Sequence, residues 1–432
     1  MAGAEPTFQS KPDTGGSVAF MLRALKYRNY RLFFGGQIVS LTGTWITTTA
    51  TSWLVYRITG SALLLGVVGF ASQFPAFLLT PFAGIFVDRW NRHRLLVATQ
   101  TLSMLTSFAL AILTLTGTIT IPSLLIVSVA QGLVNAFDMP TRQAFVVTLI
   151  EDKNDLGNAI SLNSSMFNAA RLLGPTVAGA IIAASNEGWC YLIDGFSYLA
   201  VLAALLAMRV ATPALKTGSA VSPLEQFKEG WSYAYNHRAI RSIITLIALV
   251  CLVGFPYVVL MPIFAAGVLH GGPHTLGFLM TASGCGALFG ALYLASRRSM
   301  AGLGQLIPAA GAVFGLGLMA FAFSRVLWLS ILLMIVMGFG SMVQIASSNT
   351  LLQTIVEDNK RGRVMSFFLM AYFGTMPFGS LIAGSMSDRY GAPVTLAFGG
   401  ACCVAGAIWF AMTLSSIEHQ IAPTYARVDS ST

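Results

Sequence analysis

Long apolar runs, separated by short polar connectors, occupy most of the chain. Crossing the hydrocarbon core of a bilayer takes about 20 predominantly apolar residues in a helix. Runs of that length are found at 31–56, 62–87, 95–117, 121–149, 156–184, 189–209, 240–266, 274–296, 303–323, 326–352, 363–386 and 392–415. One connector, 210–239, is longer and more polar than the others and separates the first six runs from the last six. The pattern predicts an all-α integral membrane protein with twelve transmembrane helices in two six-helix bundles.

The composition excludes an ordinary soluble domain. Of the 432 residues, 55% are hydrophobic and 9% are charged, whereas soluble proteins carry about 25% charged residues. The formal net charge of +9 would suit a nucleic-acid-binding protein, but the basic residues are scattered over short connectors. We therefore interpret them as membrane-topology signals and expect no nucleic-acid partner.

Lysine and arginine set the expected orientation, because cytoplasmic connectors are enriched in them. With the N-terminus inside, only Arg57, Arg325 and Arg389 fall in external loops, and most of the 25 basic residues fall inside. We expect a multi-pass protein of a bacterial inner (cytoplasmic) membrane with both termini in the cytoplasm. The expected divisions are a tail at 1–28, a bundle at 29–209, a linker at 210–239, a second bundle at 240–415 and a tail at 416–432.

Residues that commonly bind metals or perform catalysis form no recognisable site. The five cysteines lack metal-ligand spacing, so we interpret them as small apolar residues within helices. The five histidines show no metal-binding pair on a helix. No nucleophile with a paired base and no nucleotide-binding loop is found. We expect no metal, no cofactor and no enzymatic activity.

An internal repeat relates the two bundles. The segment TLIEDKND begins at Thr148, and the similar segment TIVEDNKR begins at Thr354. In the same register Gly132 aligns with Gly338. The bundles are therefore expected to be pseudo-symmetric, with a substrate site at their interface near the membrane midplane. Rocking of one bundle against the other would then expose this site to each side in turn.

Several segments resemble the major facilitator superfamily over nearly the whole chain. GIFVDRWNRHR from Gly84 is similar to the superfamily signature between spans two and three, with Asn91 in place of its second glycine. NYRLFFGGQIVS from Asn29, RLLGPTVAG from Arg171 and TIVEDNKRGRVMS from Thr354 resemble the drug:proton antiporter-3 branch. That branch includes the enterobactin exporter and the transmembrane secretion effectors.

The resemblance implies a secondary active exporter of amphipathic small molecules, drug-like or siderophore-like, that works by alternating access and exchanges its substrate for protons. An importer or a lysolipid flippase of the same fold is the alternative within transport. A membrane sensor, a scaffold or a membrane-embedded enzyme is a more remote one. The expected partners are a small-molecule substrate, protons and the lipid bilayer, and the protein is expected to be a monomer.

The charged cluster that follows the second run is predicted to be a latch between the bundles. Its carboxylate can approach the N-terminus of another span, where free N–H groups favour an anion. It can also pair with Arg142 or with basic residues that begin the eleventh span. The motif acts as such a latch in the resembled superfamily, and positive-inside anchoring alone is the alternative. The predicted latch residues are Gly84, Asp88, Arg89, Arg92, Arg94, Lys360, Arg361 and Arg363.

Asp138, Arg142 and Arg171 lie inside expected spans, where an ionisable residue is by default a functional candidate. Asp138 is expected ~18 Å above the cytoplasmic end of its span and Arg171 ~24 Å above the same end, so the two can meet. Arg142 lies one turn below Asp138 on the same helix face. The leading interpretation is coupling to protons or substrate. A static ion pair that joins spans four and five is the alternative.

Polar, aromatic and methionine side chains near span centres are the candidates for an adaptable substrate cavity, although each is also compatible with ordinary helix packing. They are Thr42, Trp45, Thr49, Gln73, Asn163, Met166, Asn168, Tyr257, Gln344, Asn349, Tyr372 and Met376. Gly174, Pro175 and Gly179 resemble the superfamily's antiporter motif, with Ala170 in place of its first glycine, and predict a bend in the fifth span.

Two further positions bear on the expected mechanism. Antiporter branches usually place an arginine three residues before a Gln-Gly pair in the fourth span, but Ser128 stands there before Gln131 and Gly132. This departure weakens the resemblance-based argument for proton coupling. Asp194, near the outer end of the sixth span, is interpreted as an interfacial residue rather than as an external gate.

Overall fold

The computed structural model describes residues 22–209, 232–297 and 302–429. Within these ranges every regular element is a helix. The tail expected at 1–28 and the linker expected at 210–239 therefore lie mostly outside the described residues. So do certain side chains within helices, namely those of Pro81, Phe82, Gly84, Ile85, Asp88, Arg89, Lys153, Asp358, Asn359 and residues 415–429.

The first six runs form six long helices, which we call the N-half. A short 3-10 helix, η1 (Arg23–Lys26), precedes them, and another, η2 (Lys153–Asp155), lies between the fourth and the fifth. The long helices are α2 (Arg28–Thr59), α3 (Ala62–Arg89), α4 (Arg92–Leu115), α5 (Ile121–Thr148), α6 (Leu156–Ala184) and α7 (Glu187–Ala207). Short polar connectors cap several of them. Ser61, Asn91 and Asn186, for example, each accept a backbone N–H at a helix start.

The last six runs form the C-half. Its first span is composite: α9 (Arg238–Leu249), the π-helix η3 (Val250–Gly254), α10 (Tyr257–Ile263) and the π-helix η4 (Phe264–Val268). Pro256 and Pro262, which cannot donate a helix hydrogen bond, lie in this interrupted stretch. The remaining helices are α11 (Pro273–Ser296), α12 (Leu303–Phe323), α13 (Leu327–Ile355), α14 (Asp358–Tyr390) and α15 (Ala392–Asp429).

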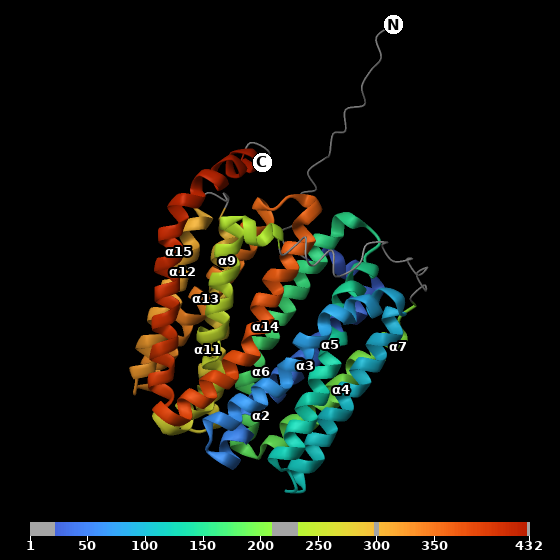
Figure 1. Ribbon diagram of the computed structural model, residues 1–432. Coiled ribbons are helices and arrows are strands. Elements are labelled where there is room, and N and C mark those ends of the chain that lie inside the picture. Colours follow the sequence, from blue (N-terminus) through green and yellow to red (C-terminus); the bar gives the residue numbers. More distant parts are fainter. Residues whose placement is uncertain (1–21, 210–231, 298–301, 430–432) are drawn as a thin grey trace.

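Eleven helices of the described chain are long and apolar enough to cross a membrane. The first predicted span, α2, is 32 residues long, but no stretch of spanning length within it is as apolar as those of these eleven. It nevertheless lies alongside them and packs against α6 and α7 in the bundle (Figure 1). The chain is therefore a multi-pass membrane protein. One of its long helices, α2, carries polar side chains along one face.

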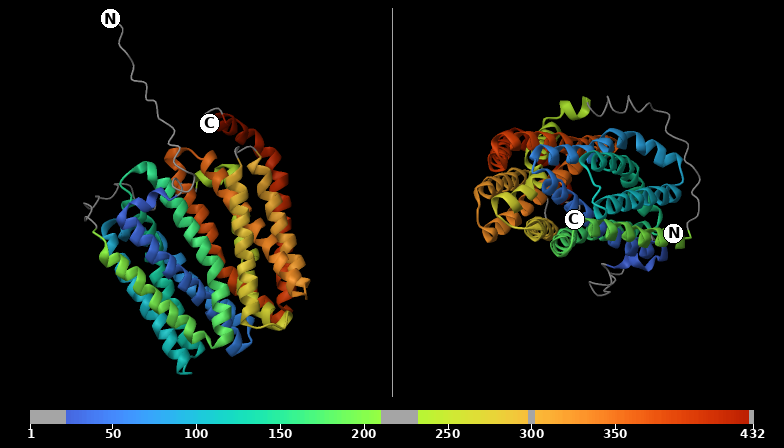
Figure 2. Two further views of the ribbon diagram at one scale, coloured as in Figure 1. Left: turned by 180° about the vertical axis from the view of Figure 1, so that it is seen from behind. Right: turned by 90° about the horizontal axis from the view of Figure 1, so that it is seen from below.

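The two halves meet along two pairs of helices, α3 with α14 and α6 with α11 (Figures 1 and 2). Glycines allow the backbones to approach closely there. A Cβ on Gly384 would lie 2.6 Å from the carbonyl oxygen of Ala62, and a Cβ on Gly277 would lie 2.6 Å from that of Pro175. Such small residues are typical of helix interfaces in membranes, where close packing replaces the hydrophobic effect.

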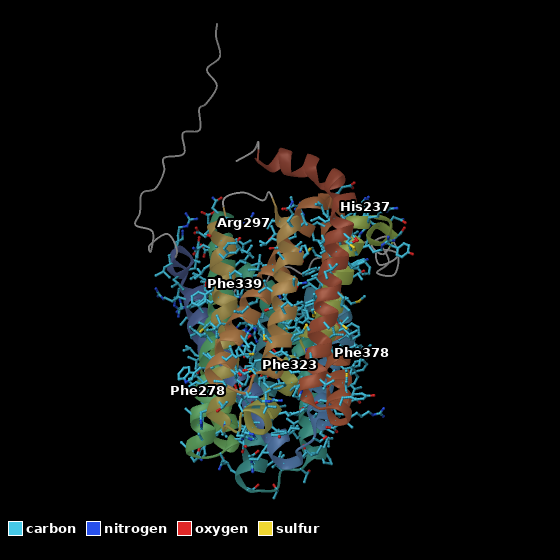
Figure 3. The ribbon with its side chains drawn as sticks, turned by 90° about the vertical axis from the view of Figure 1, so that its left-hand side faces the viewer. His237, Phe278, Arg297, Phe323, Phe339 and Phe378 are labelled. Carbon is cyan, nitrogen blue, oxygen red and sulfur yellow. The ribbon has the colours of Figure 1, made fainter. Side chains whose placement is uncertain are left out.

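We call the end of the bundle that carries Arg92, Arg94, Lys360 and Arg361 the basic end, and the opposite end the far end. The basic end is the upper end in Figures 1 and 3, where Arg297 also lies. Large apolar side chains point outward from the bundle below it. Phe323 is 65% exposed and Phe278 is 46% exposed (Figure 3). An exposed apolar belt of this kind suits lipid rather than water.

Candidate functional site

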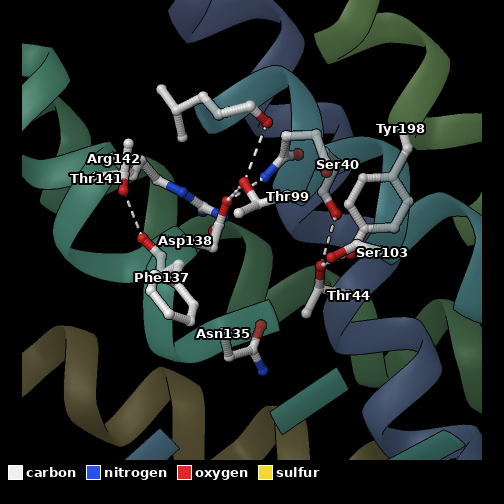
Figure 4. A network of polar contacts seen from close by, with 12 residues as sticks. Ser40, Thr44, Thr99, Ser103, Asn135, Phe137, Asp138, Thr141, Arg142 and Tyr198 are labelled. Atoms are coloured by element: carbon white, nitrogen blue, oxygen red, sulfur yellow. Dashed lines mark hydrogen bonds and ion pairs between the residues drawn. The ribbon is translucent and has the colours of Figure 1, made fainter. Parts of the chain in front are cut away.

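Asp138 lies in the interior of the N-half, on the face of α5 that packs against α4. The residue as a whole is 3% exposed. One carboxylate oxygen accepts hydrogen bonds from Thr99 Oγ1 at 2.9 Å and from Gln100 Nε2 at 2.7 Å, both on α4 (Figure 4). A buried carboxylate is costly unless its charge is matched by donors, and α4 supplies two of them.

Arg142 completes the environment of Asp138. The two side chains form a hydrogen-bonded ion pair one helical turn apart (Figure 4). The arginine side chain is 21% exposed and the aspartate 4% exposed, so the pair has an accessible partner and a buried one. The expectation that these two residues share a helix face is confirmed. The arrangement places a buried carboxylate and a partly exposed guanidinium together within a long apolar helix.

The expected meeting of Asp138 with Arg171 is wrong for this structure. Arg171 lies over the indole ring of Trp45, with its guanidinium carbon 6.0 Å from the ring centroid. The reason is how the helices pack: α6 packs chiefly against α2 and α11, whereas Asp138 faces α4. Neighbours in sequence are thus not neighbours in this part of the bundle, and a static pair between spans four and five is not formed.

Trp45, Phe167 and Arg171 form a small aromatic and cationic group between α2 and α6. The rings of Trp45 and Phe167 meet edge to face at 5.8 Å. Gly174 lies against the Cβ of Trp45 and the backbone of Ile46, so any larger residue there would push α6 away from α2. Arg171 forms no ion pair with a described acidic side chain. The group therefore combines a flat apolar surface with a positive charge that remains able to bind an anion.

The other first-half cavity candidates take several environments. Thr42, Thr49, Gln73 and Asn168 each donate to a carbonyl of their own helix. Thr49 and Met166 are each 2% exposed, whereas Thr42, Gln73, Asn163 and Asn168 are half-buried. Within the N-half, the half-buried residues remain the better candidates for contact with a substrate.

In the C-half, Tyr257 and Gln344 turn toward the interior of their own bundle. The Tyr257 hydroxyl hydrogen-bonds with Ser283 Oγ at 2.8 Å, and its ring packs on Phe314. Gln344 is fully buried and faces Gly311 of α12. The remaining second-half candidates, Asn349, Tyr372 and Met376, are half-buried. The apolar neighbours of Tyr257 and Gln344 thus weaken their assignment to an inter-half cavity.

The predicted helix-bend residues lie at helix contacts. Pro175 lies inside α6, which continues through it. Beyond it, Gly179 approaches α11 so closely that a Cβ would lie 2.8 Å from the carbonyl oxygen of Pro273. One turn away, Thr176 shares a 2.6 Å hydrogen bond with Thr281. The motif thus forms part of the contact between the halves on the far side of the midplane.

The predicted latch is described only in part, because the side chains of Gly84, Asp88 and Arg89 lie outside the described residues. Arg92 donates to the carbonyl of Ala144 at 3.5 Å, and Arg361 donates to that of Gln353 at 3.1 Å. The Nζ atom of Lys360 lies 3.3 Å from Oε2 of Glu357 and forms an ion pair with it. Arg94 is exposed, and Arg363 is half-buried. The latch therefore remains a prediction.

A second carboxylate of the N-half is buried, contrary to its interpretation as interfacial. Asp194 of α7 is 1% exposed. It accepts hydrogen bonds from Thr47 Oγ1 at 2.9 Å, Ser107 Oγ at 2.7 Å and Ser197 Oγ at 3.4 Å. The interpretation failed because the distance of a residue from the helix end does not tell whether its side chain faces lipid, water or another helix. The polar residues of α2 and α4 that recur every three or four positions were the available signal.

Asp388 at the far end was also missed. Its carboxylate accepts the backbone N–H of Ala62 at 2.8 Å and the hydroxyl of Ser61 at 3.1 Å, so it caps the start of α3 from the opposite half. The signal was present, because Gly384, Asp388 and Arg389 repeat the spacing of the first three latch residues. The two copies end antiparallel helices, so they lie at opposite ends of the bundle.

A third carboxylate, Asp155 of η2, fastens the N-terminal segment at the basic end. It forms ion pairs with Arg23 and, at 2.6 Å, with Lys26, and it accepts the Tyr27 hydroxyl at 2.8 Å. The hydrogen bond from Lys26, helped by Tyr27 and Arg23, lowers the pKa of Asp155 below its ordinary value of 3.8. This cluster joins the start of α2 to the start of α6.

The sequence of this chain is similar to those of known membrane transport proteins. The profile of a family described as transmembrane secretion effector matches residues 21–428. The staphyloferrin A transporter of Staphylococcus aureus is 28% identical over 362 residues, which cover 84% of this chain and 90% of that protein. The multidrug efflux pump Tap of Mycolicibacterium fortuitum is 26% identical, with coverage of 82% and 88%. The macrolide efflux protein A of Streptococcus pyogenes is 22% identical, with coverage of 85% and 92%.

Solved structures share the fold at lower identity. A POT family transporter in complex with a thioalcohol conjugated peptide superimposes with a TM-score of 0.75 at 10% identity, covering 90% of this chain and 96% of that one. A bacterial homolog of the human lysosomal transporter Spinster, inward-facing and occupied, gives 0.68 at 15% identity, covering 93% and 98%. These likenesses bear on the fold alone.

Proposed function

The chain belongs to the transmembrane secretion effector family of major facilitator transporters, and from that premise we propose that it exports amphipathic small molecules in exchange for protons. The observation that carries the proposal is the buried Asp138 beside Arg142 inside a spanning helix. Ionisable side chains at this depth are costly and typically mark ion or proton pathways. Relatives named for siderophore transport, multidrug efflux and macrolide efflux support the substrate class.

The substrate is proposed to contact the group formed by Trp45, Phe167 and Arg171. Its aromatic faces offer apolar contact of limited specificity, and Arg171 can bind a carboxylate or another anionic group. The half-buried Asn163 and Asn168 lie on the same helix and add hydrogen-bonding capacity. An amphipathic molecule with an apolar body and a polar or anionic part fits this combination.

Alternating access is proposed to use the two inter-half contacts in turn. At the far end Asp388 caps α3, and glycines bring α3 against α14 and α6 against α11. Because α3 and α14 run antiparallel, the corresponding partner for Asp88 is the start of α14 at the basic end. We propose that Asp88 joins the halves there when the far end opens, with Arg92, Arg94, Lys360, Arg361 and Arg363 around it.

The proposed orientation places the basic end and both termini in the cytoplasm of a bacterial cell, with the protein acting as a monomer in the inner membrane. The concentration of basic residues supports this orientation. It also fixes the direction of the transport assay. If the basic end faced outward, transport from the basic end to the far end would fill right-side-out vesicles instead of everted ones.

Everted membrane vesicles with an acidic lumen test the function. They should accumulate members of a panel consisting of ethidium, a macrolide, a carboxylate siderophore and a lysophospholipid, and release protons as they do so. Asp138→Asn removes the titratable group, so pH-driven accumulation should fall by about tenfold or more. Asp152→Asn, the same change at an exposed loop residue, is the matched control.

Wild-type levels of pH-driven accumulation in Asp138→Asn would refute the role of Asp138 in coupling. Accumulation only in right-side-out vesicles would favour an importer, and movement of the lysophospholipid alone would favour a flippase. If wild-type vesicles released no protons with any substrate of the panel, proton exchange itself would be contradicted.

A further inference from the structure

Three polar stripes face one another inside the N-half. Residues three or four positions apart share a helix face, and such positions are polar over two turns or more on α2 and α4 and over one turn on α7. The stripes consist of Gln37, Ser40, Thr44 and Thr47 on α2; Thr99, Gln100, Ser103, Thr106 and Ser107 on α4; and Asp194, Ser197 and Tyr198 on α7. Figure 4 shows Ser40, Thr44, Thr99, Ser103 and Tyr198 gathered beside Asp138. The stripes explain why α2 is the most polar of the long helices of the N-half.

The stripe of α4 connects two buried carboxylates. Its basic-end part, Thr99 and Gln100, donates to Asp138. Its far-end part, Ser107, donates to Asp194. Thr99 and Ser107 are eight positions apart, which corresponds to ~12 Å along the helix axis. The two acids thus occupy different depths of the same buried tract.

Gln131 of α5 bridges the middle of the tract. Its Nε2 donates to Ser103 Oγ at 3.1 Å, and its Oε1 accepts from Thr106 Oγ1 at 2.6 Å. Ser103 and Ser107 are 3% and 4% exposed. Gln131 therefore joins Thr106 to Ser103, and Ser107, the next residue along α4, donates to Asp194.

One turn of α4, between Ser103 and Gln100, separates this bridge from Asp138. Three buried amide atoms of the stripes have no protein partner: Oε1 of Gln100 on this turn and both terminal atoms of Gln37 on α2. Buried polar atoms are normally satisfied by protein or by ordered water. The tract accordingly has both the polarity and the open hydrogen-bonding capacity to accept water at this turn.

Asp194 differs from Asp138 in having no basic partner among the described side chains. The segments that pack against it, residues 32–55 of α2 and 95–115 of α4, contain no titratable side chain. On its own helix the nearest titratable groups are Cys190, Tyr191 and Tyr198, none of them basic, and Glu187 is paired with Arg57 at the far end. Hydroxyls hold this carboxylate, and no fixed positive charge prevents it from being neutralised.

We propose that Asp194 is a second proton-binding group and that the polar stripe of α4 carries protons between it and Asp138, a proposal that rests on the proton exchange proposed above. A proton entering from the far end converts the Asp194 carboxylate into the carboxylic acid. The hydroxyls of Ser107, Thr106 and Ser103 bind water molecules, and each water accepts one proton while it donates another, so the excess proton passes along the stripe and over the turn at Gln100. Asp194 returns to the carboxylate, and Asp138 receives the proton and releases it at the basic end.

The site itself is tested with the proton as the probe and no transport substrate. Infrared difference spectra of the purified protein in lipid, recorded while the pH is lowered, should show protonation of buried carboxyls. Asp194→Asn should remove one such signal, and Asp194→Glu should restore a shifted one. An unchanged carboxyl signal in Asp194→Asn, or no buried carboxyl signal in the wild type, would overturn the proposal.

The route is tested by transport of ethidium into proteoliposomes that contain a pH-sensitive dye. Thr106→Ala should lower ethidium-coupled proton flux several-fold, and Asp194→Asn should lower it by about tenfold or more, while both retain ethidium exchange without a gradient. Thr101→Ala is the matched control, because Thr101 is on the same helix and bonds only its own backbone at Val97.

The outcomes separate the two proposals. A wild type without proton-coupled ethidium flux counts against the proposed function, and the infrared titration still decides the proton site. Wild-type flux in a folded Asp194→Asn or Thr106→Ala variant would refute the route alone. Loss of gradient-free exchange in Asp194→Asn would make Asp194 a structural residue and would also overturn the proposal.

Discussion

The two halves have the same number of spans but bury different chemistry. The N-half encloses Asp138, Arg142 and Asp194 within a hydroxyl-rich tract. Among the described side chains of the C-half helices, charged ones occur only near helix ends, and the interior is apolar apart from serines, two threonines and Gln344. The two halves thus share the number of their long helices but differ in their buried ionisable side chains. The difference indicates that one half handles protons and the other serves mainly as a closely packed partner.

Glycine contacts hold the helices of both halves together, and the N-half adds polar contacts of ionisable groups to them. Gly286 of α11 lies against the backbone of Ile335, and Gly338 of α13 lies against that of Ser283. In the repeat, Gly338 corresponds to Gly132, which lies against Ser72 and Pro75 of α3. The backbone contact is shared by both halves, but the C-half adds no ionisable group to it.

The largest expected effect is on the packing of the C-half. Gly338→Val places a branched side chain against the backbone of Ser283, and overpacking of this kind costs about 1–3 kcal/mol or more. We expect a clear fall in thermal stability and in the yield of monodisperse protein on size-exclusion chromatography. Gly35→Val is the control, because a Cβ at Gly35 meets nothing within 4 Å. Equal stability of the two variants would contradict the packing role.

A smaller effect is expected where the halves meet at the far end. Asp388→Ala removes the cap on α3, a type of change that costs about 0.5–2 kcal/mol, whereas Asp388→Asn keeps an acceptor. If this contact opens more often in the alanine variant, maleimide should label a cysteine introduced at Ser380 about two- to tenfold faster there. The five native cysteines require a parallel measurement without S380C. Unchanged labelling in Asp388→Ala would show that the cap does not influence closure.

The smallest effect concerns the loops that the repeat shares. Asp155 pairs with Arg23 and Lys26, whereas its repeat counterpart Arg361 donates to a carbonyl. Because the pKa of Asp155 is lowered in the folded protein, its stabilisation is present above the unfolded-state pKa. It is lost as the pH falls through the lowered folded-state value. Melting temperatures should therefore decline less between pH 7 and acid pH in Asp155→Asn than in the wild type. Parallel curves would refute this.

The candidate site was predictable where local spacing decides geometry. Asp138 and Arg142 are four positions apart, so a helix brings them together in any tertiary context. The pairing of Asp138 with Arg171 failed because it assumed that consecutive helices pack side by side. The burial of Asp194 was missed because a polar face can point to lipid headgroups, to a cavity or to another helix, and only the packing of α2 and α4 on α7 distinguishes these cases.

The sequence by itself determined that this is a membrane protein, where its helices lie, the repeat and the basic end. The physical reason is that a bilayer imposes a length and an apolarity that any spanning helix must show locally. Only the tertiary structure decided which polar faces meet, that Arg171 lies on Trp45, that Asp388 caps α3 and that α4 joins two acids. These contacts link residues far apart in sequence through helix rotation and neighbour choice, which hydrophobic periodicity leaves open.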